Sequence, residues 1–339
     1  MTDHCEQNLR APIRQLTGVR IVGVGSYVPD RVVKNEDLAA LGCDPQWILR
    51  RSGIRERRHA PPEMATSDLA VKAAERCIAA AGAARGDVDL VVLGTFTPDL
   101  PMPSTACAVQ HKLGLCCPAM DVQAACAGFF YALATAMQFV ATGCSKLALA
   151  IGADCNSRVV DPQDVKTYPL FGDGAGAVLL SRGSATQGFV AYALGADGSG
   201  FDLLNCPMGG SRMPANAERL AGRMQYLKME GRPVFKWAVR MLVHSICEVL
   251  MAAKLTPGDV DLYLLHQANA RILDAVAAEL NIPPAKMPMN VDRYGNTSSG
   301  SIPLVLDECL SLGQVRSGSN LVLSGFGGGL AWGTGLFRW

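Results

Sequence analysis

The feature of this sequence that most constrains its fold is an internal echo. The segment ARGDVDLVVLGT (84–95) resembles TPGDVDLYLLHQ (256–267), so that Gly86 and Gly258 correspond at a separation of 172 residues. A second pair of apolar segments, CSKLALAIGAD (144–154) and GSNLVLSGFGGG (318–329), corresponds at nearly the same separation. Because this separation is about half of the 339-residue chain, the sequence predicts two similar halves rather than an array of short repeats.

Each half alternates helical and strand-like segments. The segments 67–82 and 235–254 carry apolar residues at spacings of three and four, which is typical of helices with one buried face. The strand-like segments between the helices are short, continuous apolar runs, as in mixed or parallel sheets that helices cover on both faces. In open α/β sheets, functional residues gather where strands end. We therefore expect an α/β fold with its site just after these strands.

Composition excludes several classes of protein. A formal net charge of +1 argues against a general nucleic-acid or membrane-surface binder. Residues 122–145 contain no charge and could span a bilayer, but their Ala, Gly and Gln content favours a buried helix in a large core. The twelve cysteines follow no zinc-site or small disulfide-scaffold spacing, so we expect most of them to be buried thiols in a reducing compartment. The N-terminus carries no apolar signal segment, so the sequence predicts a cytoplasmic protein. None of the functions considered below requires a metal or a bound redox cofactor.

Cys126 lies in DVQAACAGFF, between a strand-like run and a clear helix. A cysteine at a helix N-terminus faces unpaired backbone N–H groups and the positive end of the helix dipole, both of which favour the nucleophilic thiolate. The small neighbouring residues would let a substrate approach closely. The alternative is a small buried thiol at a tight helix–sheet junction, and this segment alone leaves both interpretations open.

His266 and Asn296 are two further candidates. His266 follows the apolar run DLYLL and precedes a helix, so it lies at the carboxyl end of a predicted strand. Asn296 lies in YGNTSSGSIP, a turn that leads into another helix. The repeat separation places Ser298 to Gly300 opposite Cys126 and its neighbours. Taken singly, the His could be a hydrogen-bonded core residue and the Asn a helix cap.

Two glycine-rich segments differ in what they predict. In SGFGGGLAWG (324–333), the N–H groups of Gly327 to Gly329 could bind an oxyanion, although a tight β-turn would use the same residues. FGDGAGA (171–177) lacks the spacing and the following helix of a nucleotide-binding loop. It precedes a strand, and it predicts close backbone packing near a site.

The ordered set DVQAACAGF, LHQANARI, YGNTSSGSIP, FGDGAGA, GFGGGLAWG and WILRRSGIRERR resembles the 3-oxoacyl-[acyl-carrier-protein] synthase III family, condensing enzymes of the thiolase superfamily. The resemblance runs from about Val19 to Trp339. It implies a duplicated five-layered αβαβα fold in a homodimer, with thiolase-like halves at 19–184 and 185–339 after an N-terminal extension, 1–18. It also implies initiation of fatty-acid synthesis by decarboxylating condensation of an acyl-CoA with malonyl-[acyl-carrier protein].

The resemblance assigns roles to particular residues. Cys126 would carry the acyl group, and His266 and Asn296 would stabilise the enolate that forms when malonyl thioester loses carbon dioxide. The backbone N–H groups of Cys126 and Gly328 would form the oxyanion hole. The remaining assignments are to the CoA site, the acyl pocket and the carrier-protein docking site. Trp47, Arg51 and Arg158 would bind CoA. The acyl pocket would include Phe326 and, from the dimer partner, Met102. The carrier protein would dock at Lys236, Gln267 and Arg271.

The sequence also departs from the family's pattern. Ala278 and Glu279 stand where the family has lysines that attract the acidic carrier protein, and Arg232 replaces a small polar residue near the pantetheine path. Such changes leave open a related acyltransferase or condensing enzyme of a secondary-metabolite pathway. A non-catalytic partner subunit of the same fold, or a hydrolase built on Cys, His and Asn, would be further alternatives.

Overall fold

The two copies of the echo form corresponding strands in two separate five-stranded sheets. The computed structural model describes residues 11–339. The first sheet has the order β2-β8-β7-β5-β6 and the second β1-β9-β14-β13-β12. The echo itself forms β5 (Leu90–Gly94) and β12 (Leu262–Leu265), while the second pair of apolar segments forms β7 (Leu147–Asp154) and β13 (Asn320–Gly327). The predicted duplication is therefore present in the structure.

Strand directions also correspond between the sheets. In the first, β5 runs parallel to β7 and to β6 (Ala119–Val122), and antiparallel pairing then joins β7 to β8 (Gly174–Arg182) and β8 to β2 (Val19–Tyr27). In the second, β12 and β13 are parallel, and β14 (Ala331–Arg338) pairs antiparallel with both β13 and β9 (Gly188–Ala196).

The sheets differ at their edges. The second sheet has no counterpart of β6 and instead gains β1 (Arg14–Thr17), which pairs antiparallel with β9 at the opposite edge. Residues 14–17, which the sequence prediction assigned to an N-terminal extension, are thus part of the second sheet. The first ten residues of that extension lie outside the described residues.

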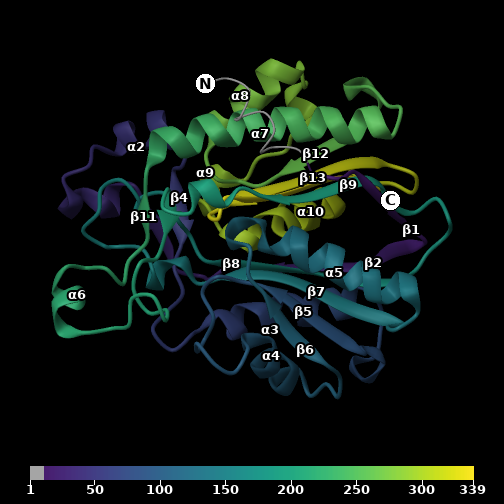
Figure 1. Ribbon diagram of the computed structural model, residues 1–339, viewed down its shortest axis with the longest axis horizontal. Helices are drawn as coiled ribbons and strands as arrows, with labels where there is room; N and C mark the ends of the chain where they lie inside the picture. The colour runs from purple at the N-terminus through teal and green to yellow at the C-terminus, as the bar shows by residue number, and fades with distance from the viewer. Residues whose placement is uncertain (1–10) are drawn as a thin grey trace.

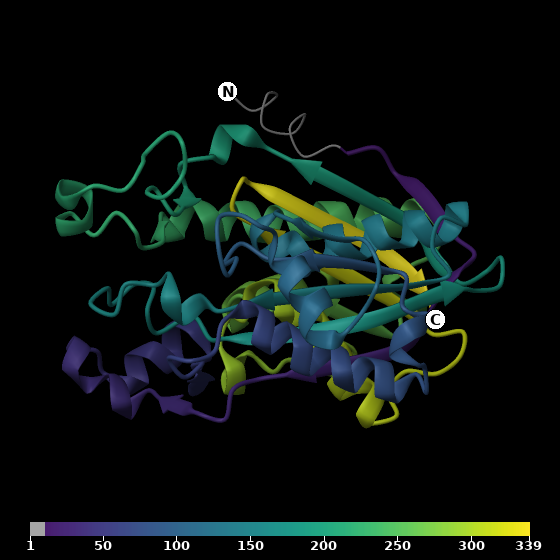
Figure 2. The same cartoon turned by 90° about the horizontal axis from the view of Figure 1, so that it is seen from below.

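Helices form three layers around the two sheets (Figures 1 and 2). The helices α5 (Gly128–Thr142) and α10 (Ser301–Ser311) lie between the sheets. The helices α3 (Thr66–Ala80) and α4 (Thr105–Leu113) cover the outer face of the first sheet, and α7 (Gly231–Ala252) and α8 (Ala270–Leu280) cover that of the second. This is the expected five-layered αβαβα arrangement.

The apolar segment that could have been a membrane span lies in the middle layer. Ala125–Thr142 is long and apolar enough to cross a bilayer by length and composition alone. In the fold, the side chains of Phe129, Phe130, Leu133 and Met137 are buried in the core shared by the two sheets. A helix packed between two sheets needs apolar residues around most of its circumference, which explains the absence of charge.

Shorter elements gather at one end of the molecule, at the left of Figure 1. They surround the end of the molecule where α5 and α10 begin. These elements are α2 (Pro45–Ser52), the hairpin β3 (Val32–Lys34) and β4 (Glu56–Arg58), the ribbon β10 (Leu204–Asn205) and β11 (Lys228–Met229), α6 (Ala217–Ala221) and α9 (Val291–Tyr294).

The expectation that most cysteines are buried is wrong. Eleven cysteines lie in the described residues, all as free thiols, and only five of them are buried, namely Cys43, Cys77, Cys126, Cys155 and Cys309. A thiol is small and only weakly polar, so helix surfaces and loops accept it as readily as the core does. The exposed cysteines are Cys107, Cys116, Cys144, Cys206 and Cys247.

A close approach between the halves gives a test of the architecture. A Cβ atom added to Gly152 in β7 would lie 2.2 Å from the backbone carbonyl oxygen of Ser299 in the other half. Because neither backbone can give way easily, we expect Gly152→Ala to lower the free energy of unfolding by about 3 kcal/mol or more. Urea unfolding followed by circular dichroism measures this loss.

The matched control is Gly86→Ala, because a Cβ at Gly86 meets nothing within 4 Å. That variant should stay within about 0.5 kcal/mol of the wild type. Equal stability of the two variants would contradict the close contact between the halves.

Candidate active site

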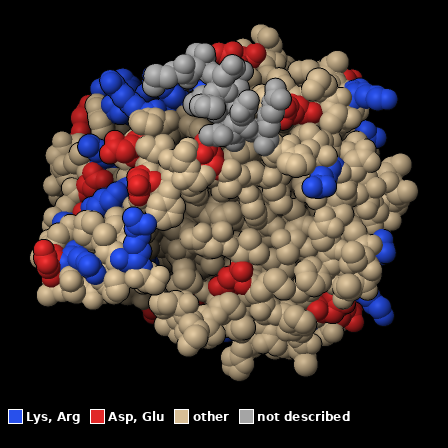
Figure 3. All heavy atoms as spheres, viewed as in Figure 1, with Lys and Arg blue, Asp and Glu red and all other residues tan. Residues whose placement is uncertain are grey.

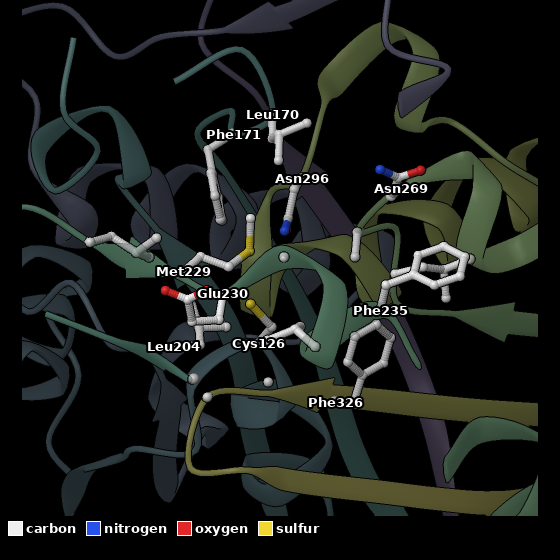
Figure 4. A pocket seen from close by; sticks show the side chains of 18 of the residues that line it. Cys126, Leu170, Phe171, Leu204, Met229, Glu230, Phe235, Asn269, Asn296 and Phe326 are labelled. Carbon is white, nitrogen blue, oxygen red and sulfur yellow. The ribbon is translucent and has the colours of Figure 1, made fainter. Parts of the chain in front are cut away.

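A cavity of about 1240 Å³ opens at the end of the molecule where the short elements gather. Its lining comes from both halves and includes Cys126, His266, Asn296 and Phe326. Figure 4 shows Cys126 and Asn296 on facing sides of this cavity, with Phe326 below them. The structure therefore brings together the three residues that the sequence singled out separately.

Cys126 occupies a sharp turn between β6 and α5. The turn is a single 3₁₀ turn, Ala125–Ala127, in which Ala125 has a left-handed backbone with φ of 46°. Such a conformation is strained for a residue with a side chain, and here it turns the chain abruptly from strand to helix. The Cys126 side chain is buried, with 7% of its surface exposed.

A matching turn leads into α10 in the second half. It is the 3₁₀ turn Ser298–Gly300, and Ser298 has a φ of 53°. Ser298 and Ala125 each begin their turn, so the same strained turn occurs in both halves. The two turns touch, since the Ser298 hydroxyl lies 3.2 Å from the Cys126 Sγ and the Ser299 hydroxyl donates to the Ala125 carbonyl oxygen.

The sequence predicts a thiolate at Cys126, but the surroundings of this residue favour the neutral thiol. Burial raises the pKa of the Cys126 thiol to about 12, and the nearby Asp154 carboxylate acts in the same direction. The hydrogen bond from Ser298 works against this shift but is the smaller effect. The Cys126 thiol is therefore neutral at physiological pH, because burial disfavours the charged form.

His266 lies directly after β12 and is almost completely buried. Its Nδ1 is 2.7 Å from the Ser301 hydroxyl, and the edge of its ring packs against Phe326. Burial lowers the pKa of His266 to about 3, so the ring is neutral at physiological pH. The Gln267 N–H also donates to the Ser301 oxygen, and in the tautomer used below the Ser301 hydroxyl donates to Nδ1. In that tautomer the proton of the ring is on Nε2, the nitrogen that is left to face the cavity.

Asn296 is held so that its amide group also presents a donor. Its Oδ1 accepts a hydrogen bond of 2.8 Å from the Ser298 N–H. The amide nitrogen consequently points into the cavity on the side of Cys126 (Figure 4). The backbone N–H of Asn296 donates to Leu170, and Phe171 forms an isolated bridge with Asn296, so the FGDGAGA segment supports this residue as close backbone packing.

A buried carboxylate underlies the two turns. Asp154, the last residue of β7, is inaccessible to solvent and accepts hydrogen bonds from three consecutive residues after β5, namely Thr95, Phe96 and Thr97. Its other oxygen accepts from the Ser299 N–H at 3.0 Å. Burial raises the pKa of Asp154, while hydrogen bonds from the Ser298 side chain and from the Ser299 and Phe96 N–H groups oppose that shift. Sequence reasoning missed Asp154, because GADC at the end of a strand carries no distinctive spacing.

The glycine-rich turn between β13 and β14 lies against Cys126. A Cβ at Gly327 would lie 2.5 Å from the Cys126 backbone nitrogen, and one at Gly328 would lie 2.7 Å from the Leu204 carbonyl oxygen. Both positions therefore need glycine. Gly328 lines the cavity together with Cys126, as an oxyanion hole formed by their two N–H groups requires.

Several predicted substrate-binding residues lie at the cavity mouth. Trp47 and Arg51, both on α2, line it, and the Arg51 guanidinium lies 5.1 Å from the centre of the Trp47 ring. Lys236 and Arg271 also line the cavity and are exposed. Figure 3 shows Lys and Arg interspersed with Asp and Glu at this end of the molecule, whereas the centre of the face is largely uncharged.

Three residues that the sequence analysis assigned to substrate or carrier-protein binding do not line the cavity, namely Arg158, Gln267 and Met102. Arg158 is absent from the cavity lining, and its guanidinium donates to the carbonyl oxygens of Pro61 and Met64. Gln267 cannot dock a carrier protein, because it is fully buried and its side chain bonds to the backbone of Leu265 and Asn290.

Met102 is 83% exposed in the loop before α4 and does not line the cavity of its own chain. Sequence reasoning missed Lys166, a cation that does line the cavity. In the described part of the chain, no group of three or more His, Cys, Asp or Glu side chains could hold a metal ion.

A duplicated five-layered fold with a Cys-His-Asn cavity at the junction of its halves defines a thiolase-fold acyltransferase. Comparison with known proteins agrees with this class. The family model described as 3-oxoacyl-[acyl-carrier-protein (ACP)] synthase III matches residues 120–198, and the model of its C-terminal part matches residues 250–339.

The beta-ketoacyl-[acyl-carrier-protein] synthase III of Rhodopirellula baltica is 53% identical over 96% of this chain and 99% of its own. That of Desulfitobacterium hafniense is 46% identical over 96% and 98%. The crystal structure of 3-oxoacyl-[acyl-carrier-protein] synthase III from Aquifex aeolicus superposes with a TM-score of 0.87, at 40% identity over 95% of this chain and 100% of that one.

The chain belongs to the beta-ketoacyl-[acyl-carrier-protein] synthase III family. It is a condensing acyltransferase of fatty-acid biosynthesis, which joins an acyl-CoA to malonyl-[acyl-carrier protein] in the initiating step.

The neutral state of His266 predicts how stability depends on pH. In the unfolded chain this His takes up a proton near pH 6.5, whereas the folded protein resists protonation until about pH 3. Acid therefore favours the unfolded state, and stability from this residue is lost as the pH falls below about 6.5. Between pH 8 and pH 5, the wild type should lose about 2 kcal/mol more unfolding free energy than His266→Gln.

Urea titrations at the two pH values measure this difference. The control is His111→Gln, which removes an exposed His on α4 and should keep the pH dependence of the wild type. If His266→Gln also kept it, His266 would not be held neutral.

Proposed function

We propose that Cys126 carries the acyl group as a thioester and that His266 and Asn296 drive the decarboxylating condensation. The observation that carries this proposal is the meeting of one nucleophile and two aimed donors in a single cavity. The His266 Nε2–H and the Asn296 amide face the cavity that Cys126 lines, and their remaining polar atoms are occupied by Ser301 and Ser298.

In the first step, the Cys126 sulfur attacks the carbonyl carbon of the acyl-CoA. A sulfur–carbon bond forms, the bond to the CoA sulfur breaks, and the proton of the thiol ends on the released CoA. The N–H groups of Cys126 and Gly328 would stabilise the tetrahedral oxyanion. A thiol suits this role because it is both a good nucleophile and a good leaving group.

In the second step, malonyl-[acyl-carrier protein] loses carbon dioxide, and the electron pair of the broken bond forms an enolate. Neutral donors at His266 and Asn296 stabilise the enolate oxygen without attracting the malonyl carboxylate as strongly as a cation would. Loss of carbon dioxide becomes easier when that carboxylate is not itself stabilised. The enolate carbon then attacks the acyl thioester, and Cys126 leaves with the electron pair of the carbon–sulfur bond.

The cavity mouth supports recognition of both thioester carriers. Trp47 can stack on the adenine of CoA while Arg51 meets phosphate, and Lys166 supplies a further cation where Arg158 does not reach the cavity. Lys236 and Arg271 suit the acidic carrier protein. Arg232 also lines the mouth, so it offsets part of the charge lost at Ala278 and Glu279.

A homodimer would complete the acyl pocket. The edge strand β6 leaves one side of the first sheet free to pair, and the loop before α4 exposes two apolar side chains, Leu100 and Met102. Contribution of Met102 to the partner's pocket would explain an apolar side chain that is otherwise in solvent. Free thiols throughout the described chain suit the reducing cytoplasm.

Two of the alternatives fit the geometry less well. A non-catalytic partner subunit has no need of a nucleophile with two aimed donors. A hydrolase would need an activated water, whereas neutral His266 is a poor base. A condensing enzyme of a secondary-metabolite pathway would use the same site, but relatives at 46–53% identity favour the fatty-acid reaction.

Partial reactions test the assigned roles. Intact-mass analysis after incubation with a panel of acyl-CoAs should show one acyl adduct in the wild type and none in Cys126→Ala. His266→Ala and Asn296→Ala should still acylate, yet release carbon dioxide from malonyl thioester about 100-fold more slowly, because each lacks one enolate donor. An adduct that persists in Cys126→Ala would refute the nucleophile, and unchanged decarboxylation would refute the donors.

Charge reversal tests the carrier-protein surface. The double variant Lys236→Glu, Arg271→Glu should raise KM for malonyl-[acyl-carrier protein] about tenfold at low salt, with kcat largely kept and the effect shrinking as salt is added. The control is Lys254→Glu, because Lys254 is exposed and lies just past the C-terminal end of α7. If the two proteins had the same KM, the carrier protein would dock elsewhere.

A further inference from the structure

The reacting sulfur has a hydrogen-bond partner that neither the sequence motifs nor the family resemblance assigns to catalysis. The Ser298 hydroxyl lies 3.2 Å from the Cys126 Sγ, and both side chains are buried. We infer that Ser298 is a catalytic residue whose hydroxyl donates to the Cys126 sulfur and stabilises the negative charge it gains in both steps. This inference rests on the proposed role of Cys126 as the acyl carrier.

The surroundings of the sulfur show why such a donor is needed. Two titratable groups share its environment. Asp154, at the end of β7, opposes charge on the sulfur, and His266, at the end of β12, is neutral and a poor proton acceptor. Burial also disfavours the thiolate. Ser298 is the side chain that acts in the opposite direction, since its hydrogen bond lowers the pKa of Cys126.

The hydroxyl of Ser298 also forms a hydrogen bond that opposes the raised pKa of Asp154. The backbone of Ser298 determines the position from which this side chain extends. Its φ of 53° is a strained conformation, and the flanking contacts maintain it. The Ser298 N–H is bound to the Asn296 Oδ1, and the next N–H, from Ser299, is bound to the buried Asp154 carboxyl. Because the Asn296 contact uses only the backbone of Ser298, a change of side chain would remove the hydroxyl and leave that contact in place.

The Ser298 hydroxyl stabilises negative charge on the sulfur at two points of the catalytic cycle. During acylation, the sulfur gains charge as its proton leaves, before the carbon–sulfur bond forms and CoA departs with that proton. During condensation, the carbon–carbon bond forms, the carbon–sulfur bond breaks, and the electron pair returns to the sulfur beside Ser298. A proton from solvent then restores the thiol, which balances the release of carbon dioxide from the malonyl carboxylate.

The pH dependence of alkylation measures this effect directly. The full-length protein is treated with iodoacetamide across a pH series, and mass spectrometry follows the peptide that contains Cys126, since exposed cysteines also react. Because hydrogen bonds to charged groups are strong, Ser298→Ala should be alkylated at Cys126 about tenfold to 100-fold more slowly than the wild type at each pH well below the pKa of the thiol. Single-turnover acylation at pH 7 should slow by about tenfold to 100-fold.

Two further variants keep the result interpretable. Ser298→Gly also lacks the hydroxyl, but glycine adopts a φ of 53° without strain, so it folds even where alanine destabilises the turn. Ser245→Ala removes a buried hydroxyl in α7 that bonds to Thr334, and it should match the wild type.

A folded Ser298→Gly or Ser298→Ala with the wild-type rates of Cys126 alkylation and acylation would overturn the role of Ser298. Failure of the underlying proposal would look different, because acyl transfer would then persist in Cys126→Ala.

Discussion

The contact between the two helix-leading turns is the constraint on which the rest of the structure depends. Each half of the chain contributes one strained turn, and the backbones meet so closely that Gly152 has no room for a Cβ beside Ser299. Asp154 anchors the contact by binding the Ser299 N–H on one side and residues after β5 on the other. Cys126 and Asn296 are thereby fixed relative to each other by main chain, which suits their proposed roles as nucleophile and enolate donor better than flexible side chains would.

Burial at this junction determines the electrostatic character of the site. The same removal from water keeps the Cys126 thiol protonated and His266 neutral in the free protein. Neutral donors suit a reaction in which a substrate carboxylate must depart, whereas a buried cation would hold it. The cost is a thiol that is hard to ionise, so stabilisation of the sulfur must come from fixed dipoles such as the Ser298 hydroxyl and the backbone N–H groups that precede α5.

Sequence patterns predicted the features that repeat or that carry reactive atoms. The duplicated fold followed from an echo 172 residues apart, and Cys126 and His266 were recognisable at strand ends. The contacts that hold these residues were not visible, because Asp154 and Ser298 are common residue types whose importance arises only when distant strands meet. Arg158 and Gln267 illustrate the opposite error. Each is a suitable residue type near a motif, but its side chain bonds to the backbone of its own half instead of facing the cavity. Cysteine burial was also overestimated, because composition gives no information on which face of a helix a thiol occupies.

The most direct test of this account is a crystal structure of the protein acylated by its acyl-CoA substrate. The account predicts continuous density from the Cys126 Sγ to an acyl carbonyl whose oxygen accepts hydrogen bonds from the N–H groups of Cys126 and Gly328, with Asn296 and His266 facing the empty malonyl position. Density for the acyl group on another residue, or a carbonyl oxygen turned away from those two N–H groups, would contradict it.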